Sequence, residues 1–286
     1  MIEWPESLVE DIARRRAVIV VGSGVSKNAI NKDGKNPPTW SEFLNIAVTK
    51  CQKDEREIRR KIRQGDYLTA CDWLKNRLDE KWNTLLNEEF VNPAYLAADI
   101  HKSIFRLDTR FVITPNFDKI YDNLCTLESE GTIIVKNYYD DDITEAVRGN
   151  KRLILKAHGT IDSPGRMVFT REDYARVRAS HAEFYEILEA LLITHTFIFI
   201  GCGTDDPDFR LLLEKHQFSN RKSPPHYMTL AKPLNPDHIR TMRNTMNVKL
   251  LGYSPADQHK ELKSSLVQLF ELVDAQRETI ADKRAW

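Results

Sequence analysis

The sequence predicts an α/β protein with a Rossmann-like, doubly wound, mostly parallel sheet and a helical insertion or small domain. Short runs of β-branched and aromatic residues recur along the chain, and helical patterns separate most of them, as in parallel strands joined by helices. Between residues 41 and 106, apolar residues instead recur at helical spacing without a convincing strand. We therefore expect a Rossmann-like domain formed by residues 1–40 and 107–286, interrupted by a helical block at 41–106.

The expected strands are continuous apolar runs, which suit parallel strands buried on both faces. They lie at residues 17–21, 111–114, 132–135, 153–155, 196–200, 226–230 and 248–251. A short helix is expected near 5–16, and three to five helices fill the helical block. The last helix, about 257–280, has an apolar stripe that predicts a core-facing side, with an assembly surface as the alternative.

Composition narrows the class of protein. Among 286 residues, 41% are hydrophobic and 29% are charged, as in a globular protein. Lys+Arg and Asp+Glu balance at 42 each, which argues against direct binding of nucleic acid. No apolar run reaches the roughly 18 residues that span a membrane, and the N-terminus lacks a secretory pattern. We therefore expect a cytoplasmic protein that has no contact with a membrane.

The cysteines predict reduced thiols and no metal site. The four of them, Cys51, Cys71, Cys125 and Cys202, form no Cys-x-x-Cys pair. Zinc sites that use cysteine need such closely spaced ligands. The expected protein therefore contains no metal.

Ligands of open α/β sheets bind beyond the carboxyl ends of the strands, and four polar motifs fall at such ends. The first is Gly-Ser-Gly-Val-Ser at 22–26, directly after the strand at 17–21. Its glycines allow a tight turn and close approach to a pyrophosphate, although a purely structural turn explains them equally well. The motif departs from the dehydrogenase fingerprint, because Lys27 occupies the position of the third glycine.

The second and third motifs supply polar side chains after the expected strands at 111–114 and 153–155. Asn116 lies in Thr-Pro-Asn-Phe-Asp at 114–118, and its carboxamide can bind a water and a ribose hydroxyl at once. Asp118, in the same motif, is either a site residue or the N-cap of the next helix. His158 lies in Lys-Ala-His-Gly at 156–159. Its imidazole can accept a proton from water or from a ribose hydroxyl, and the alternative is a hydrogen-bonded turn histidine.

The fourth motif, Gly-Cys-Gly-Thr-Asp-Asp-Pro-Asp at 201–208, follows the strand at 196–200. Its small residues permit close approach to a nucleotide. Asp205 or Asp206 is expected to cap the following helix, with Pro207 in the first turn. Cys202 lies between the glycines, but no neighbouring base marks it as a nucleophile.

Taken in order, the four motifs resemble those of the sirtuin (silent-information-regulator-like) superfamily. The similarity is greatest to the zinc-free bacterial NADase branch that is found in antiphage defence systems. Trp40 and the segments 168–174 and 208–210 match as well, so that the resemblance spans about residues 17–255.

The resemblance implies that the chain binds NAD as a substrate. It implies that Asn116 and His158 form the catalytic pair and that Asp118 lies near the nicotinamide ribose. Four residues of the first loop would hold the diphosphate region of NAD: Gly22, Ser23, Gly24 and Ser26. Three residues of the fourth motif would flank the cofactor: Gly201, Gly203 and Asp206.

Two departures argue against a peptide substrate. Deacylases of this superfamily carry a zinc module after the His-Gly motif, yet no cysteine lies between His158 and Cys202. Their Pro-Asp-Phe-Arg motif is also missing after Ser26. The sequence thus favours an NAD+ glycohydrolase that releases nicotinamide and ADP-ribose. The alternatives are an NAD-dependent protein deacylase and a non-catalytic sensor of NAD or ADP-ribose. The resemblance further implies a homo-oligomer and a partner of the HerA-type hexameric ATPase class.

Overall fold

The computed structural model describes residues 1–51, 55–203 and 206–284. Its centre is a seven-stranded sheet in the order β3-β4-β2-β1-β5-β6-β7, and every strand pairing in it is parallel. The strands are β1 Ala17–Val21, β2 Phe111–Thr114, β3 Ile134–Asn137, β4 Leu153–Lys156, β5 Thr196–Ile200, β6 His226–Ala231 and β7 Val248–Tyr253. The predicted Rossmann-like α/β fold is confirmed.

The edge strand β3 begins two residues later than the sequence suggested. The cause is the turn that follows the preceding helix. Glu130 and Gly131 both adopt positive φ angles, and the N–H of Thr132 donates to the carbonyl of Ser129. Thr132 therefore still belongs to the turn, although its β-branched side chain favours a strand.

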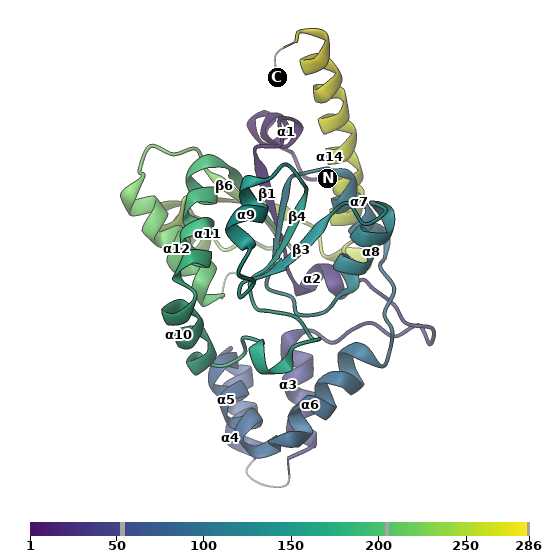
Figure 1. Cartoon of the computed structure of the whole chain (residues 1–286), viewed down its shortest axis with the longest axis vertical. Coiled ribbons are helices and arrows are strands. Elements are labelled where there is room, and N and C mark those ends of the chain that lie inside the picture. The colour runs from purple at the N-terminus through teal and green to yellow at the C-terminus, as the bar shows by residue number, and fades with distance from the viewer. Residues whose placement is uncertain (52–54, 204–205, 285–286) are drawn as a thin grey trace.

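Helices cover both faces of the sheet, as the two sides of Figure 1 show. Side chains of β1 alternate between two cores, with Ile19 on one face and Val18 and Val20 on the other. The first face is covered by α1 Glu6–Ala13, α7 Asp99–Arg106, α8 Ile120–Glu128 and α14 Ala256–Asp282. The second is covered by α9 Ile143–Arg148, α10 Arg171–Ser180, α11 Ala182–Thr194, α12 Pro207–Ser219 and α13 Pro236–Met246. This two-sided covering is the doubly wound arrangement.

A third core belongs to the helical block, which lies below the sheet in Figure 1, beyond the carboxyl ends of the strands. Its buried residues include Phe43, Leu74 and Trp82, and they pack with Met167 and Phe169 from the segment after β4. The block consists of α3 Trp40–Thr49, α4 Glu55–Arg63, α5 Tyr67–Leu78, α6 Glu80–Leu86 and the π-helical turn η1 Asn87–Val91. It therefore covers the edge at which the four polar motifs lie.

The predicted range 41–106 contains residues of two different cores. Its last helix, α7, buries Ile100 and Ile104 in the core of the first sheet face, where it packs against α14. Within α14, the predicted stripe from Leu262 to Val273 is buried in that same core, as a core-facing helix requires. No helix in the described part of the chain is both long and apolar enough to cross a membrane.

Candidate active site

A cavity of about 540 Å³ lies between the carboxyl edge of the sheet and the helical block. Its walls come from the segments that follow β1, β2, β4 and β5, together with the starts of α3 and α5 and the turn η1. Every residue of the predicted site lines it except Gly24 and Gly201. The sheet thus brings together motifs that are up to about 180 positions apart in the sequence, as expected for a ligand site of this fold.

The first and fourth motifs are interlocked. The N–H of Gly22 donates to the carbonyl of Ile200, and the N–H of Gly24 donates to the carbonyl of Gly201, both at 2.9 Å. A Cβ atom on Gly22 would lie 2.3 Å from the Gly201 oxygen, and one on Gly201, whose φ is +65°, would lie 2.6 Å from the Val25 nitrogen. These glycines are therefore required by the contact of the two loops with each other. For Gly203, by contrast, an added Cβ atom would meet no atom of the described residues within 4 Å.

Ser26 connects the first motif to the second. Its Oγ accepts a hydrogen bond from Asn116 Nδ2 at 3.0 Å and donates to Asp118 Oδ2 at 2.8 Å. The Oδ1 of Asp118 accepts from the N–H of Ile120, so this residue both supports the start of α8 and belongs to the pocket. Within the described chain, the Oδ1 of Asn116 has no hydrogen-bond partner, which leaves a fixed carbonyl acceptor for a ligand or a water.

His158 follows β4 and is buried, with 6% of its surface exposed. Its ring packs edge-on against Tyr174, with ring centroids 5.1 Å apart. The Nε2 atom lies 3.3 Å from Asp206 Oδ2, but it has no partner in hydrogen-bond geometry among the described residues. Buried polar atoms without partners are rare in folded proteins, so this nitrogen at the cavity wall marks a place for a ligand or a water.

Asp206 caps α12, and Pro207 occupies the first turn. Its Oδ1 accepts from the N–H groups of Asp208 and Phe209, both at 3.0 Å, while its Oδ2 accepts from the Tyr174 hydroxyl at 3.3 Å. Burial, together with the negative charge of Asp206, raises the pKa of Tyr174 well above its ordinary value, so the phenol stays a neutral donor. The other capping candidate, Asp205, lies outside the described residues.

An aromatic wall closes the side of the cavity that faces the helical block. Trp40 stacks on Phe169 with ring centroids 5.3 Å apart and planes 3° apart, and Phe117 packs edge-on against both Phe90 and Phe169. Trp40, Phe117 and Phe169 lie in segments that the sequence motifs already included, whereas Phe90 was not anticipated. Phe90 lies in a π-helical turn, for which the sequence gives no periodic signal.

A cluster of ion pairs joins the helical block to the sheet domain at the cavity rim. The Arg171 guanidinium lies 3.0 Å from Oδ1 of Asp66, and Lys61 Nζ lies 3.0 Å from its Oδ2. Although burial raises the pKa of Asp66, hydrogen bonds from Lys61, Thr69 and Arg171 lower it to about 2. Asp66 therefore remains charged across the physiological range.

Cys202 lines the cavity, and its thiol donates to the backbone carbonyls of Val20 and Ile200. Burial, with a contribution from the charge of Asp206, raises the pKa of its thiol far above the ordinary value. The thiol is therefore protonated at neutral pH and is a poor nucleophile. Across the described residues, no group of three or more His, Cys, Asp or Glu side chains is placed to hold a metal ion.

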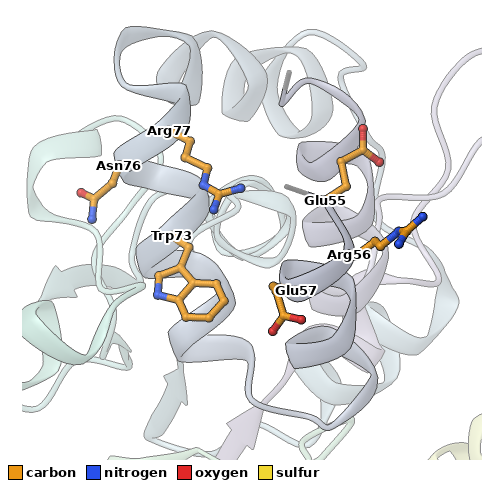
Figure 2. A pocket seen from close by; sticks show the side chains of 6 residues that line it. All are labelled: Glu55, Arg56, Glu57, Trp73, Asn76 and Arg77. Carbon is orange, nitrogen blue, oxygen red and sulfur yellow. The ribbon is translucent and has the colours of Figure 1, made fainter. Parts of the chain in front are cut away.

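A second hollow, of about 990 Å³, lies within the helical block between α4 and α5. Figure 2 shows Trp73 and Arg77 of α5 pointing toward α4, opposite Glu55 and Glu57. None of the predicted site residues lines it. The arrangement of the strand-end motifs therefore makes the 540 Å³ cavity the candidate active site.

The parallel sheet and the polar cavity at its carboxyl edge define a Rossmann-like α/β protein with a strand-end binding site. The chain belongs to the SIR2-like family, because the family model of the SIR2-like domain matches residues 110–259. This membership confirms the resemblance to sirtuins that the sequence motifs indicated.

Curated relatives extend the comparison. Two proteins named NAD(+) hydrolase ThsA, from Enterococcus faecium and Acinetobacter baumannii, are 25% and 23% identical to this chain over 238 and 236 residues. These matches cover 80% and 82% of this chain and 46% of each relative. Defense-associated sirtuin 2 of Bacillus subtilis is 26% identical over 222 residues, which cover 74% of this chain and 20% of that protein. The chain thus spans less than half the length of these relatives.

Proposed function

We propose that this chain is an NAD+ glycohydrolase, which cleaves the nicotinamide–ribose bond and gives nicotinamide and ADP-ribose. The observation that supports it most is that Asn116, whose amide is fixed by Ser26, and His158 line one cavity, and that the buried Nε2 of His158 has no hydrogen-bond partner among the described residues. The relatives named NAD(+) hydrolase support the same reaction, and the relative named defense-associated sirtuin 2 supports a role in defence. In this proposal the chain depletes NAD in the cytoplasm as an effector of antiphage defence.

The chemistry of cleaving the nicotinamide–ribose bond determines which groups the site must provide. When the bond between C1′ and the pyridinium nitrogen breaks, its electron pair stays with nicotinamide, which leaves as a neutral molecule. No general acid is needed, and an oxocarbenium-like centre develops at C1′. A water must then add to C1′ and lose one proton. Catalysis therefore depends on electrostatics and on the orientation of the water.

The proposed roles follow from the hydrogen bonds. The bond to Ser26 fixes the carboxamide of Asn116, so that its Oδ1 accepts from the attacking water. His158 takes the proton of the water or orients a ribose hydroxyl, and the carboxylate of Asp206, 3.3 Å away, stabilises the imidazolium that forms. Asp118 lies beside the nicotinamide ribose.

The two interlocked loops make up the dinucleotide side of the proposed site. Ser23, Ser26 and Gly203 line the cavity where the diphosphate and the flanking riboses would bind. Gly24 and Gly201 do not line the cavity. Their role is indirect, because the hydrogen bond between them holds the two loops together. In this division, residues 1–40 and 107–286 bind NAD, while the helical block at 41–106 covers the cavity and shields it from water.

Incubation of the purified chain with NAD, followed by chromatography of the products, tests the proposal. We expect nicotinamide and ADP-ribose in equal amounts. Deacylation of an added acetyl-lysine peptide would identify a deacylase instead. Binding of NAD or ADP-ribose without any release of nicotinamide would identify a sensor.

We further infer that control comes from assembly, because an unrestrained NADase would harm its own cell. A homo-oligomer, with a HerA-type hexameric ATPase as the regulating partner, is the arrangement that the resemblance favours, and the balanced charge gives no sign of direct nucleic-acid sensing. Light scattering at low micromolar concentration, with NAD turnover measured in parallel, provides the test. A strict monomer with full activity on its own would exclude both parts of this inference.

A further inference from the structure

Lys156 is a buried cation two positions before His158. It is the last residue of β4, and its side chain is 1% exposed. Its Nζ donates to Oδ2 of Asp122 on α8 and to the backbone carbonyl of Asp118, both at 2.7 Å. Lysine is almost never fully buried unless it is paired, so the partners of this ammonium group are specific.

The two bonds of Lys156 have different consequences. The pair with Asp122 only neutralises charge, and buried ion pairs are in general weak evidence of stabilisation, because apolar residues of similar volume often serve as well. The bond to the Asp118 carbonyl reaches the main chain of the loop that carries Asn116. No apolar side chain could replace that second bond.

Asp118, whose backbone carbonyl accepts from Lys156, is also linked to Asn116 by two successive hydrogen bonds, which we call the relay. The carboxylate of Asp118 accepts from Ser26 Oγ, and Ser26 Oγ accepts from the Asn116 amide. The ladder between β2 and β4 ends nearby, where Thr114 pairs with Lys156 and the N–H of Ala157 donates to the Thr114 carbonyl. Beyond this point the Asn116 loop and the His158 loop leave the sheet. The N–H of Ile161 donates to the carbonyl of Phe117, and an exposed ion pair joins Lys119 to Asp162. Lys156 is the buried side chain among these links between the two loops.

We propose that Lys156 is a positioning residue for the cleavage of NAD: its bond to the Asp118 carbonyl holds Asn116 in register with His158. This inference rests on the proposed NAD+ glycohydrolase activity. A shift of the Asn116 loop of about 1 Å, relative to His158, is enough to lower the rate by on the order of 100-fold when geometry limits the reaction.

The experiment separates the two bonds of Lys156. The double variant Lys156→Met/Asp122→Leu replaces the ion pair with an apolar pair and removes the bond to the Asp118 carbonyl. The single variant Asp122→Asn breaks the ion pair but keeps that bond. A matched control, Lys136→Met/Asp142→Leu, removes the ion pair between Lys136 of the neighbouring strand β3 and Asp142 at the start of α9, and neither residue lines the cavity.

We expect kcat of the Lys156→Met/Asp122→Leu variant to fall by roughly 10- to 100-fold, with KM changed by less than about threefold. Asp122→Asn and the β3 control should keep at least about half of the wild-type kcat. Adding Ser26→Ala to the double variant should lower kcat by less than the product of the separate losses, because both changes act on one relay. Loss of stability alone would give neither the kcat-specific effect nor this non-additivity.

Another double variant, Lys156→Gln/Asp122→Asn, is included in case Lys156→Met/Asp122→Leu does not fold. It replaces the ion pair with a neutral polar pair. The glutamine side chain is one atom shorter than lysine, so its amide cannot occupy the position of Nζ, which lies 2.7 Å from both the Asp118 carbonyl and Asp122 Oδ2. Circular dichroism and the melting temperature establish that each variant is folded. A wild-type kcat in either folded variant of Lys156 would overturn the inference. Failure of both Lys156 variants to fold would also overturn it, because Lys156 would then be a folding residue. If the wild-type chain itself releases no nicotinamide, the proposed function fails first, and the inference fails with it.

Discussion

The Oδ2 of Asp206 lies 3.3 Å from the Nε2 of His158, while the Oδ1 of the same carboxylate caps α12. One side chain therefore sets both the start of a helix and the surroundings of the proposed catalytic base. Tyr174 completes the group, because its hydroxyl donates to the Oδ2 that faces His158. The orientation of that carboxylate is thus fixed from two sides before any substrate binds.

Substitutions of Asp206 should separate its two roles. Asn is as good an N-cap as Asp, so Asp206→Asn should keep the free energy of unfolding within about 0.5 kcal/mol of wild type. It removes the negative charge beside His158, and we expect NAD turnover to fall by roughly tenfold. Asp206→Ala should lose similar activity and, in addition, about 1 kcal/mol of stability. Urea unfolding measures the effect on stability, and nicotinamide release measures the effect on turnover. Wild-type turnover in Asp206→Asn would show that Asp206 acts only as the N-cap of α12.

The proposed catalytic pair should be indispensable for turnover. We expect Asn116→Ala and His158→Ala each to lower the rate of nicotinamide release by roughly 100-fold or more, the scale of a lost positioning or acid–base group. Asn150→Ala, at an exposed loop position, and His238→Ala, on α13, are the matched controls. A folded Asn116 or His158 variant with near-wild-type release would contradict the assignment.

Sequence reasoning placed the strands and the four motifs well because both leave local signals. A continuous apolar run such as 17–21 indicates a strand buried on both faces, and in this fold the ligand binds after such strands. The contacts between the motifs left no such signal. Lys156 reads as an ordinary polar residue at the end of a strand, and its partner Asp122 is 34 positions away. Burial of a lysine is decided by packing in three dimensions, which one sequence does not reveal.

The glycines illustrate a second limit. A Gly-Ser-Gly sequence predicts close approach of the backbone to something, but it does not say to what. Here Gly22 and Gly24 approach Gly201 of the other loop. The identity of the approaching group depends on which strands are neighbours, and β1 and β5 pair although they are separated by about 180 positions in the sequence.

The loop contact predicts opposite outcomes for two glycines of the site. Gly22→Ala places a Cβ atom 2.3 Å from the backbone oxygen of Gly201, so the two loops must separate. We expect a loss of about 1–3 kcal/mol of stability, the usual range for overpacking, together with loss of NAD turnover. The Cβ atom of Gly203→Ala would meet no described atom within 4 Å, and this variant should unfold at the wild-type urea concentration. Equal stability of the two variants would show that the loops are not held in contact.

Metal removal should have no effect on this protein. The described residues offer no group of three or more His, Cys, Asp or Glu side chains that could hold a metal ion, and a structural zinc site needs about four such ligands. We expect the melting temperature and NAD turnover to be the same before and after treatment with a chelator. Stoichiometric zinc in an elemental analysis of the purified chain, or unfolding by the chelator, would refute this prediction.

The buried histidines predict that stability decreases in mild acid. Burial lowers the pKa of His226 to about 3, with a further contribution from nearby His216, and burial lowers the pKa of His101 to about 4. In the unfolded chain both groups bind protons near pH 6.5. Below that pH the unfolded state therefore binds more protons than the folded state, so that stability is complete above about pH 6.5 and is lost as the pH falls toward 4.

The contribution of His226 to this pH dependence can be isolated. Its Nδ1 accepts the N–H of Phe197 at 3.1 Å, and the carboxamide oxygen of Asn can accept the same hydrogen bond without titrating. Each fully excluded proton changes the free energy of unfolding by about 1.4 kcal/mol per pH unit. Urea unfolding of wild type and of His226→Asn between pH 7.5 and 4.5 should therefore show slopes that differ by close to that amount below pH 6. Identical slopes would mean that His226 gains its proton without unfolding, and hence that water reaches the space between β6 and α12.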